Sequence, residues 1–319
     1  MTDLGRIRHY GDFYGLSDGS PDAAGPLWVV MGNCQAEALR HALDAVPDRP
    51  YRTVRVPPVH ELAAEDLPHL RELLRRTAVL LSQPIRADYR DLPLGTAQLA
   101  AELPTSATLL RWPVIRYAGL YPFQVIVRRP ADRSIVPPAV PYHDLRTIVA
   151  ALDGRGPDDP WDVHVEPERL RAVAAASIAT LAERERRDTD VGVSDALGPA
   201  GVDAAHAINH PGNTVFAELA RRILGELDVP ARLADSNLGS APLLGSVFVP
   251  LERRVLDALG LAGTTRTRWL FQGESIDPEW VHRVQMTWYQ DNPDFLGLAV
   301  ERHRTTFDLL GLPTGGVAP

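Results

Sequence analysis

Apolar runs and helical patterns alternate along the first third of the chain, and this alternation limits the folds open to it. Four short runs rich in β-branched and leucine side chains predict strands, at residues 27–31, 51–56, 78–84 and 107–115. Helical patterns separate them, at 35–46, 66–77 and 95–103. Strands joined by helical crossovers form parallel sheets, so the sequence predicts an α/β fold with helices flanking a parallel sheet.

Beyond about residue 140 the chain becomes rich in helical patterns, the clearest at 142–152, 166–187 and 212–227. It stays mostly helical to about residue 311. We expect an irregular N-terminal segment (1–25), an α/β core (26–140) and a helix-rich portion (141–319) that completes the site. These parts should form one compact unit, in a three-layer arrangement of the SGNH type or a related one.

The composition excludes several classes of function. The 33 basic residues are all arginine, so no lysine can form a Schiff base, and any phosphate would be gripped by guanidinium groups. The net charge of −8 and the lack of interleaved basic and aromatic residues argue against nucleic acid as a partner. No P-loop, dinucleotide or metal motif occurs, so we expect no metal cofactor.

Apolar runs and the cysteine count also indicate where in the cell the protein resides. No apolar run approaches the roughly 20 residues that a membrane span needs, and the first residues lack an apolar signal core. A single cysteine rules out an internal disulfide. We expect a cytoplasmic protein with a reduced thiol, and a homo-oligomer is left open.

The single cysteine, Cys34, follows a predicted strand and begins a predicted helix within the motif GNCQ (32–35). Free N–H groups and the positive end of the helix dipole at such a turn should lower the pKa of the thiol and hold an oxyanion. Gly32 relieves crowding, and Asn33 and Gln35 supply amide donors. We favour a nucleophile, with a buried structural cysteine as the alternative.

A nucleophilic cysteine needs a base, usually histidine. Among ten histidines, His210 lies in a tight loop just before a predicted helix, and Asp203 and His206 form a D-x-x-H pair. His143, next to Asp144, is a further candidate. Each of these histidines is equally well explained as a loop residue whose ring only makes a hydrogen bond to the backbone.

The segment 82–99 combines Gln83, Arg86, Tyr89 and Arg90 at the end of a predicted strand and opens a helix through Gly95 and Thr96. Arginines and a helix N-terminus suit a phosphate or pyrophosphate. The alternative is a solvated loop in which these arginines pair with Asp88 and Asp91.

GNCQ after a strand, QPI…DYR…GT after a later strand, and NHP before a helix together resemble the WcbI family of polysaccharide biosynthesis proteins, over roughly residues 27–230. The resemblance implies an acyltransferase-like protein with coenzyme A (CoA) as ligand and a capsule sugar as acceptor. It implies a site core of Gly32, Asn33, Cys34 and Gln35. Its implied neighbours are Ser82, Gln83, Arg90, Gly95 and Thr96, with Asn209 and His210 as a base loop.

One segment departs from the family pattern. Residues 115–125 carry Tyr121 where a histidine is expected, which puts the role of this segment in doubt.

These observations lead to three functional readings. The first is an acyltransferase that moves an acyl group from acyl-CoA to a hydroxylated sugar or secondary-metabolite acceptor, with Cys34 as nucleophile and His210 or His143 as base. The second is a cysteine thioesterase or esterase. The third is a non-catalytic protein that binds CoA or a glycan.

Overall fold

A computed structural model describes residues 4–16, 25–130, 132, 134–230 and 233–315. The chain divides into two compact units rather than the single unit expected from sequence. The first unit comprises residues 1–115, 180–204 and 212–244; the second comprises 116–179, 205–211 and 245–319. Two segments beyond residue 140, 180–204 and 212–244, thus belong to the first unit.

A four-stranded parallel sheet forms the centre of the first unit, in the order β2-β1-β3-β4. The strands are β1 (Leu27–Met31), β2 (Arg52–Val54), β3 (Thr77–Ser82) and β4 (Thr108–Arg111). The register pairs Met31 with Ser82 and Ser82 with Arg111. The carboxyl ends of β1, β3 and β4 therefore meet at one edge, and the predicted α/β fold is confirmed.

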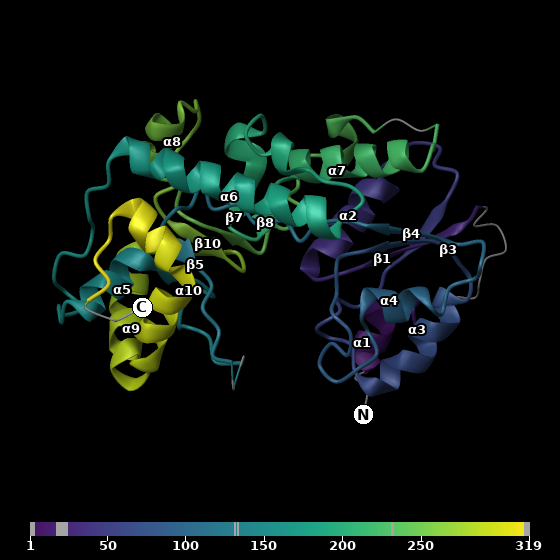
Figure 1. Cartoon of the computed structure of the whole chain (residues 1–319), viewed down its shortest axis with the longest axis horizontal. Helices are drawn as coiled ribbons and strands as arrows, with labels where there is room; N and C mark the ends of the chain where they lie inside the picture. The colour runs from purple at the N-terminus through teal and green to yellow at the C-terminus, as the bar shows by residue number, and fades with distance from the viewer. Residues whose placement is uncertain (1–3, 17–24, 131, 133, 231–232, 316–319) are drawn as a thin grey trace. The chain divides into compact units, whose positions relative to one another are not determined.

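Helices cover both faces of this sheet (Figure 1). One face carries α2 (Cys34–Asp44) and α7 (Asn213–Glu226), which pack against each other. The other carries α1 (Leu4–His9), α3 (Leu67–Leu74) and α4 (Thr96–Ala100). Side chains alternate across a strand, and Val29 and Leu80 share a core cluster with Leu70, Leu73 and Leu74 of α3, all of them fully or almost fully buried.

The N-terminal segment, expected to be irregular, contains α1 and docks through an ion pair. Arg6 on α1 contacts the fully buried carboxylate of Asp66 at 3.0 Å, and the Tyr14 hydroxyl donates to the same carboxylate at 2.7 Å. Burial by itself would raise the pKa of Asp66, but Arg6, the Ala63 N–H and Tyr14 lower it overall. Asp66 thus occupies the N-cap position of α3 without capping the helix through its side chain.

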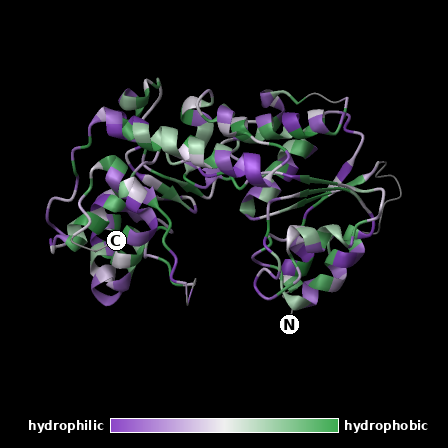
Figure 2. Cartoon of the chain, in the orientation of Figure 1, coloured by the Kyte–Doolittle hydropathy of each residue, from purple (hydrophilic) through white to green (hydrophobic). Residues whose placement is uncertain are grey.

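The second unit is built on helices with short antiparallel strand pairs. The helices are α5 (Leu145–Leu152), α8 (Arg253–Leu259), α9 (Pro278–Asp291) and α10 (Asp294–Leu310). The strand pairs are β5 (Gln124–Val125) with β6 (His143–Asp144), β7 (Ala205–Ala207) with β8 (His210–Pro211), and β10 (Trp269–Phe271) with β9 (Val247–Phe248) and β11 (Glu274–Ile276). Apolar and polar residues alternate around α9 and α10 (Figure 2), and Phe295 and Phe307 of α10 are completely buried.

Two features of the secondary structure differ from the expected pattern. The β10–β11 hairpin interrupts a region expected to be helical, and it turns on Gln272 and Gly273, both with positive φ. Such turns usually carry Asn-Gly or Asp-Gly, so Gln-Gly gives a weak sequence signal. Asparagine is a common N-cap residue, but Gly212 holds the cap position of α7, and the Asn213 side chain bonds the Ala241 carbonyl and the Leu243 N–H instead.

The remaining regular elements are one long helix, α6 (Pro167–Asp188), and four 3₁₀ turns. Residues 167–179 of α6 belong to the second unit and 180–188 to the first. The turns are η1 (Ala64–Asp66), η2 (Ser194–Ala196), η3 (Gly201–Ala204) and η4 (Asp235–Leu238). Among the described residues, no helix combines the length and apolarity that crossing a bilayer requires.

Gly212 begins α7 where the chain leaves no room for a side chain. A Cβ atom built there would lie 1.9 Å from the carbonyl oxygen of Asp203. We expect Gly212→Ala to lower the free energy of unfolding by about 2–4 kcal/mol, as backbone-displacing substitutions do, measured by urea denaturation. Gly225→Ala, in the same helix with nothing within 4 Å of the new Cβ, is the control and should be neutral or slightly stabilising. Equal losses in both variants would contradict the argument.

Candidate functional site

The GNCQ motif forms the turn between β1 and α2, at the carboxyl edge of the sheet. Cys34 is the first residue of α2, and Asn33 is its N-cap: the Asn33 Oδ1 accepts the N–H of Gln35 at 2.9 Å. Capping side chains of this type fix the first turn of a helix. The strand-to-helix placement of Cys34 predicted from sequence is confirmed.

Gln83, the first residue after β3, holds this turn from the neighbouring strand. Its Oε1 accepts the backbone N–H of Asn33 at 2.9 Å. A Cβ atom on residue 32 would lie 2.6 Å from that oxygen, so the amide can reach Asn33 only because residue 32 is glycine. Gly32 therefore makes room for a side chain from another strand.

Gln35 is fully buried and bonds a third segment of the chain. Its Nε2 donates to the Ile115 carbonyl at 2.7 Å, and its Oε1 accepts the Ile115 N–H at 3.0 Å. Gln83 Nε2 also approaches this Oε1 at 3.2 Å. The side chain of Gln35 is thus committed to the scaffold, and the expectation that it donates to an oxyanion is not supported by this geometry.

Cys34 is partly exposed, but its electrostatics differ from the expectation. Burial raises the pKa of the Cys34 thiol; the backbone N–H groups of Cys34 and Gln35 oppose this, and the Glu61 carboxylate adds to it. The helix N-terminus was expected to lower the pKa. Desolvation outweighs it here, so the thiol is mainly protonated at neutral pH.

Ser82 and Thr96 organise the turn after β3 rather than face a ligand. Both are buried. The Thr96 hydroxyl donates to the Gln83 carbonyl at 2.8 Å and accepts the Ile85 N–H at 2.9 Å. The Ser82 hydroxyl donates to the same Gln83 carbonyl at 2.8 Å. Both hydroxyls therefore anchor the backbone of Gln83, whose side chain holds the elbow.

The predicted phosphate loop has one uncommitted cation. Arg90, at positive φ, donates to the His60 carbonyl, and Tyr89 packs on the hydrophobic core. Arg86 is exposed and has no ion pair or hydrogen bond within the described residues. Neither arginine pairs with Asp88 or Asp91 as the alternative supposed.

The helix expected to bind a phosphate at its N-terminus is short. It is α4, which has only five residues and begins after Gly95. A Cβ on Gly95 would lie 2.7 Å from Ala87 Cα. Gly95 therefore permits close chain packing, and so short a helix offers little dipole to an anion.

The proposed base, His210, and its neighbour Asn209 lie in the β7–β8 hairpin of the second unit, whereas Cys34 belongs to the first. His210 is 8% exposed. The Tyr142 hydroxyl donates to Asn209 Oδ1 at 2.8 Å, and the Tyr117 N–H donates to the Ile208 carbonyl at 2.8 Å. The histidine is thus held in a fixed turn, and its pairing with Cys34 stays a prediction.

Two further residues named from sequence have positions that suggest structural roles. Tyr121, found where a histidine was expected, is buried and donates to the Ala205 carbonyl of β7 at 2.9 Å. His206, the alternative base, packs its ring against Phe248 with centroids 4.6 Å apart. Both residues hold the hairpin that carries His210.

His143 lies in the core of the second unit. It is completely buried, its Nδ1 is 2.6 Å from the Tyr289 hydroxyl, and its ring stacks on Phe295. Burial lowers the pKa of His143 to about 3, with contributions from Arg128 and His303. A neutral ring with this packing favours a structural role over that of a base.

A cluster of three arginines was not predicted from the sequence, because its members are far apart in the chain. Arg116, Arg128 and Arg302 lie close enough in the second unit that desolvation and then their mutual repulsion lower the pKa of Arg116. Arg302 Nη1 lies 3.4 Å from the Arg128 carbonyl. None of the three pairs with a carboxylate within the described residues, so the cluster could hold an anion.

Comparison with known proteins gives the following matches. A model of the family described as polysaccharide biosynthesis enzyme WcbI matches residues 27–232, well over half of the chain. A solved structure of WcbI superposes with a TM-score of 0.75 at 18% identity, over 92% of this chain and 99% of that one. That structure is described as native protein without a disulfide bond between CoA and one of its cysteines. A search of curated proteins found no match.

The raised pKa of Cys34 makes a prediction about reactivity. Alkylation requires the thiolate, so the pH midpoint for labelling with iodoacetamide should lie above about 8.5, the value for an unperturbed cysteine. The measurement is the labelling rate by mass spectrometry from pH 6 to 10. Glu61→Gln removes one repulsive charge and should move the midpoint downward. A midpoint below that of a free cysteine in the unsubstituted protein would show that the helix terminus prevails over burial.

Proposed function

The chain belongs to the WcbI family of polysaccharide biosynthesis enzymes, and on that premise we propose that it transfers an acyl group from a CoA thioester to a hydroxyl of a sugar or secondary-metabolite acceptor. The observation that carries the proposal is the position of Cys34: the only thiol in the chain lies at a rigid strand-to-helix turn. A turn at the carboxyl edge of a parallel sheet is where such folds bind ligands.

The solved structure of WcbI suggests a link to CoA. Its description names CoA and one of its cysteines and says that no disulfide bond joins them in that structure; a disulfide of this kind forms only where the two sulfur atoms come within bonding distance. This chain has only Cys34 to take that part. A thiol that can reach the CoA sulfur can also reach the adjacent thioester carbonyl of acyl-CoA.

The proposed reaction has two steps. In the first, the Cys34 thiol loses its proton to solvent, the resulting thiolate attacks the thioester carbonyl, the bond between that carbon and the CoA sulfur breaks, and the CoA sulfur takes up a proton from solvent and leaves as a thiol. In the second, an acceptor hydroxyl gives its proton to a base, for which we propose His210, and attacks the acyl group on Sγ. Cys34 is then released for another cycle.

The oxyanion formed in each step needs hydrogen-bond donors. The N–H groups of Asn33 and Gln35 are already bonded, to Gln83 Oε1 and Asn33 Oδ1 respectively. We therefore assign the oxyanion to the backbone N–H of Cys34 and the side-chain Nδ2 of Asn33. Gln35, Ser82, Gln83 and Thr96 act as positioning residues.

The phosphates of CoA need cations, and arginine is the only basic residue type in the chain. Our candidates are Arg86 in the first unit and the cluster of Arg116, Arg128 and Arg302 in the second, none of which pairs with a carboxylate in the part of the chain that the structure describes. Arg86→Ala and Arg302→Ala, assayed separately, show which of them contributes to CoA affinity.

The proposal is tested by mixing the protein with acetyl-CoA and longer acyl-CoAs and recording intact mass. We expect a mass gain equal to the acyl group, lost in Cys34→Ala because that variant lacks the nucleophile. CoA binding without a mass gain would favour direct transfer or a binding role, and no binding would overturn the proposal. Turnover that is equally fast with and without any acceptor alcohol would indicate a thioesterase.

His210→Asn tests the base. General-base catalysis contributes about 10²–10⁴-fold, so kcat should fall by at least that lower figure. Acyl-enzyme should accumulate, because an alcohol hydroxyl is a far weaker acid than the Cys34 thiol, so the second step depends more strongly on the base. His164→Asn, on an imidazole with 81% of its side chain exposed, is the control and should keep full activity. An unchanged pH profile in His210→Asn would remove His210 from the mechanism.

A further inference from the structure

Acylation of Cys34 moves a proton twice, and the surroundings of the thiol limit which groups can carry it. The proton must leave the thiol as Sγ attacks the thioester, and a proton must reach the CoA sulfur as that sulfur leaves. His210, the base proposed for the acceptor, belongs to the second unit. A carrier in the first unit is held in a fixed position relative to Cys34.

The segment after β2 lies along the turn that carries Cys34. β2 is next to β1 in the parallel sheet, so the carboxyl ends of the two strands meet at the same edge. The Val59 N–H donates to the Gly32 carbonyl at 2.8 Å, which ties this segment to the GNCQ motif. Val59 and Leu62 are both buried in the core of the first unit. Glu61 therefore lies between two residues that fix the segment against the turn.

The backbone around Glu61 is held by three hydrogen bonds. The Glu61 N–H donates to the Pro58 carbonyl at 2.8 Å, and Arg6 Nη2 donates to the Glu61 carbonyl at 3.0 Å. Arg90 donates to the carbonyl of the preceding residue, His60. The side chain of Glu61 is 47% exposed. A carboxylate on a fixed backbone with an exposed side chain can meet a bound substrate.

The Glu61 carboxylate pairs with no arginine in the part of the chain that the structure describes. His60 Nε2 is 3.9 Å from its Oε1, beyond hydrogen-bond distance, and the Tyr10 hydroxyl is 3.5 Å from its Oε2. Its negative charge acts on Cys34, where it adds to the effect of burial and raises the pKa of the thiol. Glu61 is thus a carboxylate with spare capacity to accept a proton, close to the thiol.

The other carboxylate beside the turn does not have this capacity. Glu37 lies three residues after Cys34 on α2. It pairs with Arg40 at 2.7 Å, Arg55 at 3.0 Å and His41 at 3.1 Å. Burial by itself would raise the pKa of Glu37, but these partners lower it to about 2. A carboxylate held so strongly as the anion is a poor proton acceptor.

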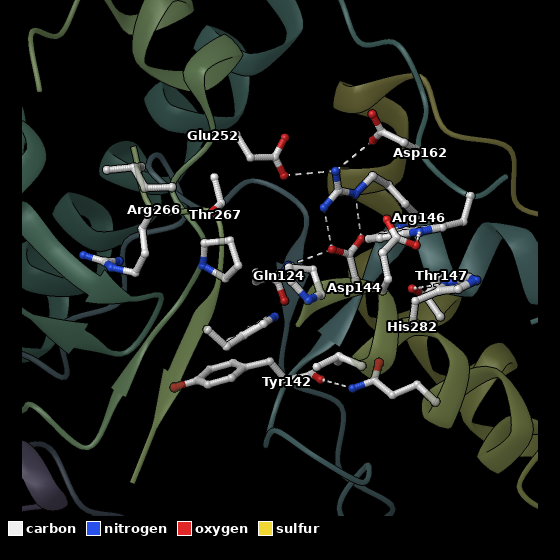
Figure 3. A pocket seen from close by; sticks show the side chains of 18 of the residues that line it. Gln124, Tyr142, Asp144, Arg146, Thr147, Asp162, Glu252, Arg266, Thr267 and His282 are labelled. Atoms are coloured by element: carbon white, nitrogen blue, oxygen red, sulfur yellow. Dashed lines mark hydrogen bonds and ion pairs between the residues drawn. The ribbon is translucent and has the colours of Figure 1, made fainter. Parts of the chain in front are cut away.

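Paired carboxylates also line the largest cavity described in the second unit, of about 410 Å³ (Figure 3). Asp144, Asp162 and Glu252 all bond the guanidinium of Arg146, at 2.7, 2.8 and 3.0 Å respectively. Charge-assisted bonds of this kind stabilise the ionised carboxylate. These groups therefore act as structural anions, whereas the carboxylate of Glu61 is available for chemistry.

We propose that Glu61 is the general base and acid of the acylation step, an assignment that rests on acyl transfer through Cys34. As Sγ attacks the thioester carbonyl, its proton passes to the Glu61 carboxylate. As the bond between that carbon and the CoA sulfur breaks, the same proton passes from the carboxylic acid to this sulfur, and CoA leaves as a thiol. Glu61 ends the step as a carboxylate, so solvent neither takes nor supplies a proton.

One negative charge then has two opposite effects on Cys34. In the free protein it disfavours a thiolate beside it. Once the carboxylate has taken the proton it is neutral, and the repulsion ends. Alkylation by a small reagent uses thiolate that is already present, whereas acylation uses the base. The two reactions should therefore respond to loss of Glu61 in opposite directions.

The test compares these reactions in Glu61→Gln, which keeps the size of the side chain but removes its charge and its basicity. Alkylation by iodoacetamide at pH 7 should become faster, because more thiolate is present. Acylation by acetyl-CoA, followed by intact mass after rapid quenching, should slow by about 10²-fold, the lower end for general-base catalysis. If Glu61 acted through its charge alone, both reactions would become faster, and unchanged or faster acylation overturns the proposal.

Three further variants separate a base from a structural role. Glu61→Ala should acylate slowly and recover with added formate, whose carboxylate replaces the missing one; failure of formate to restore any rate contradicts the proposal. Glu65→Gln, on an exposed carboxylate of the same segment, should leave both rates unchanged. His60→Gln should acylate normally, and a loss equal to that of Glu61→Gln would assign the proton to the imidazole instead.

The same data separate this assignment from acyl transfer itself. If the unsubstituted protein gains no acyl mass from acetyl-CoA or longer acyl-CoAs, acyl transfer through Cys34 is wrong and the role of Glu61 falls with it. If the unsubstituted protein and Glu61→Gln gain the mass equally fast, acyl transfer stands and only the role of Glu61 is wrong.

Discussion

The side chain of Gln83, packed against a glycine of the neighbouring strand, is the contact on which the geometry around Cys34 depends. It holds the N–H of Asn33, and Asn33 in turn caps the helix that begins at the cysteine. Ser82 and Thr96 fix the Gln83 carbonyl from the other side. Four residues that the sequence suggested as site residues, namely Asn33, Ser82, Gln83 and Thr96, therefore form a frame around Cys34.

The sequence was most informative where local pattern and tertiary structure agree. Strand-helix alternation between residues 27 and 115 predicts the parallel sheet and places Cys34 at its edge, because both follow from periodicity and from the turn at Gly32. Local pattern does not reveal the partners of Gln35 and His143. Whether an amide faces a ligand or the scaffold depends on distant partners, here Ile115 and Tyr289, which no local pattern reveals.

The electrostatic expectation for Cys34 failed for a related reason. A helix N-terminus can be read from sequence, whereas the desolvation that opposes it arises from packing. The cavity lined by Arg146 was likewise invisible. Its walls come from segments more than a hundred residues apart, such as Gln124 and Gln285.

The ion pairs of this protein have a consequence for its own integrity. Those that fix α1, the cavity wall and the end of β4 all use guanidinium groups, and the chain contains no lysine. Side-chain amines react spontaneously with thioesters, whereas guanidinium groups are protonated and poorly nucleophilic. A chain without lysine therefore offers no side-chain amine for activated acyl groups to modify, and its guanidinium salt bridges stay intact in their presence.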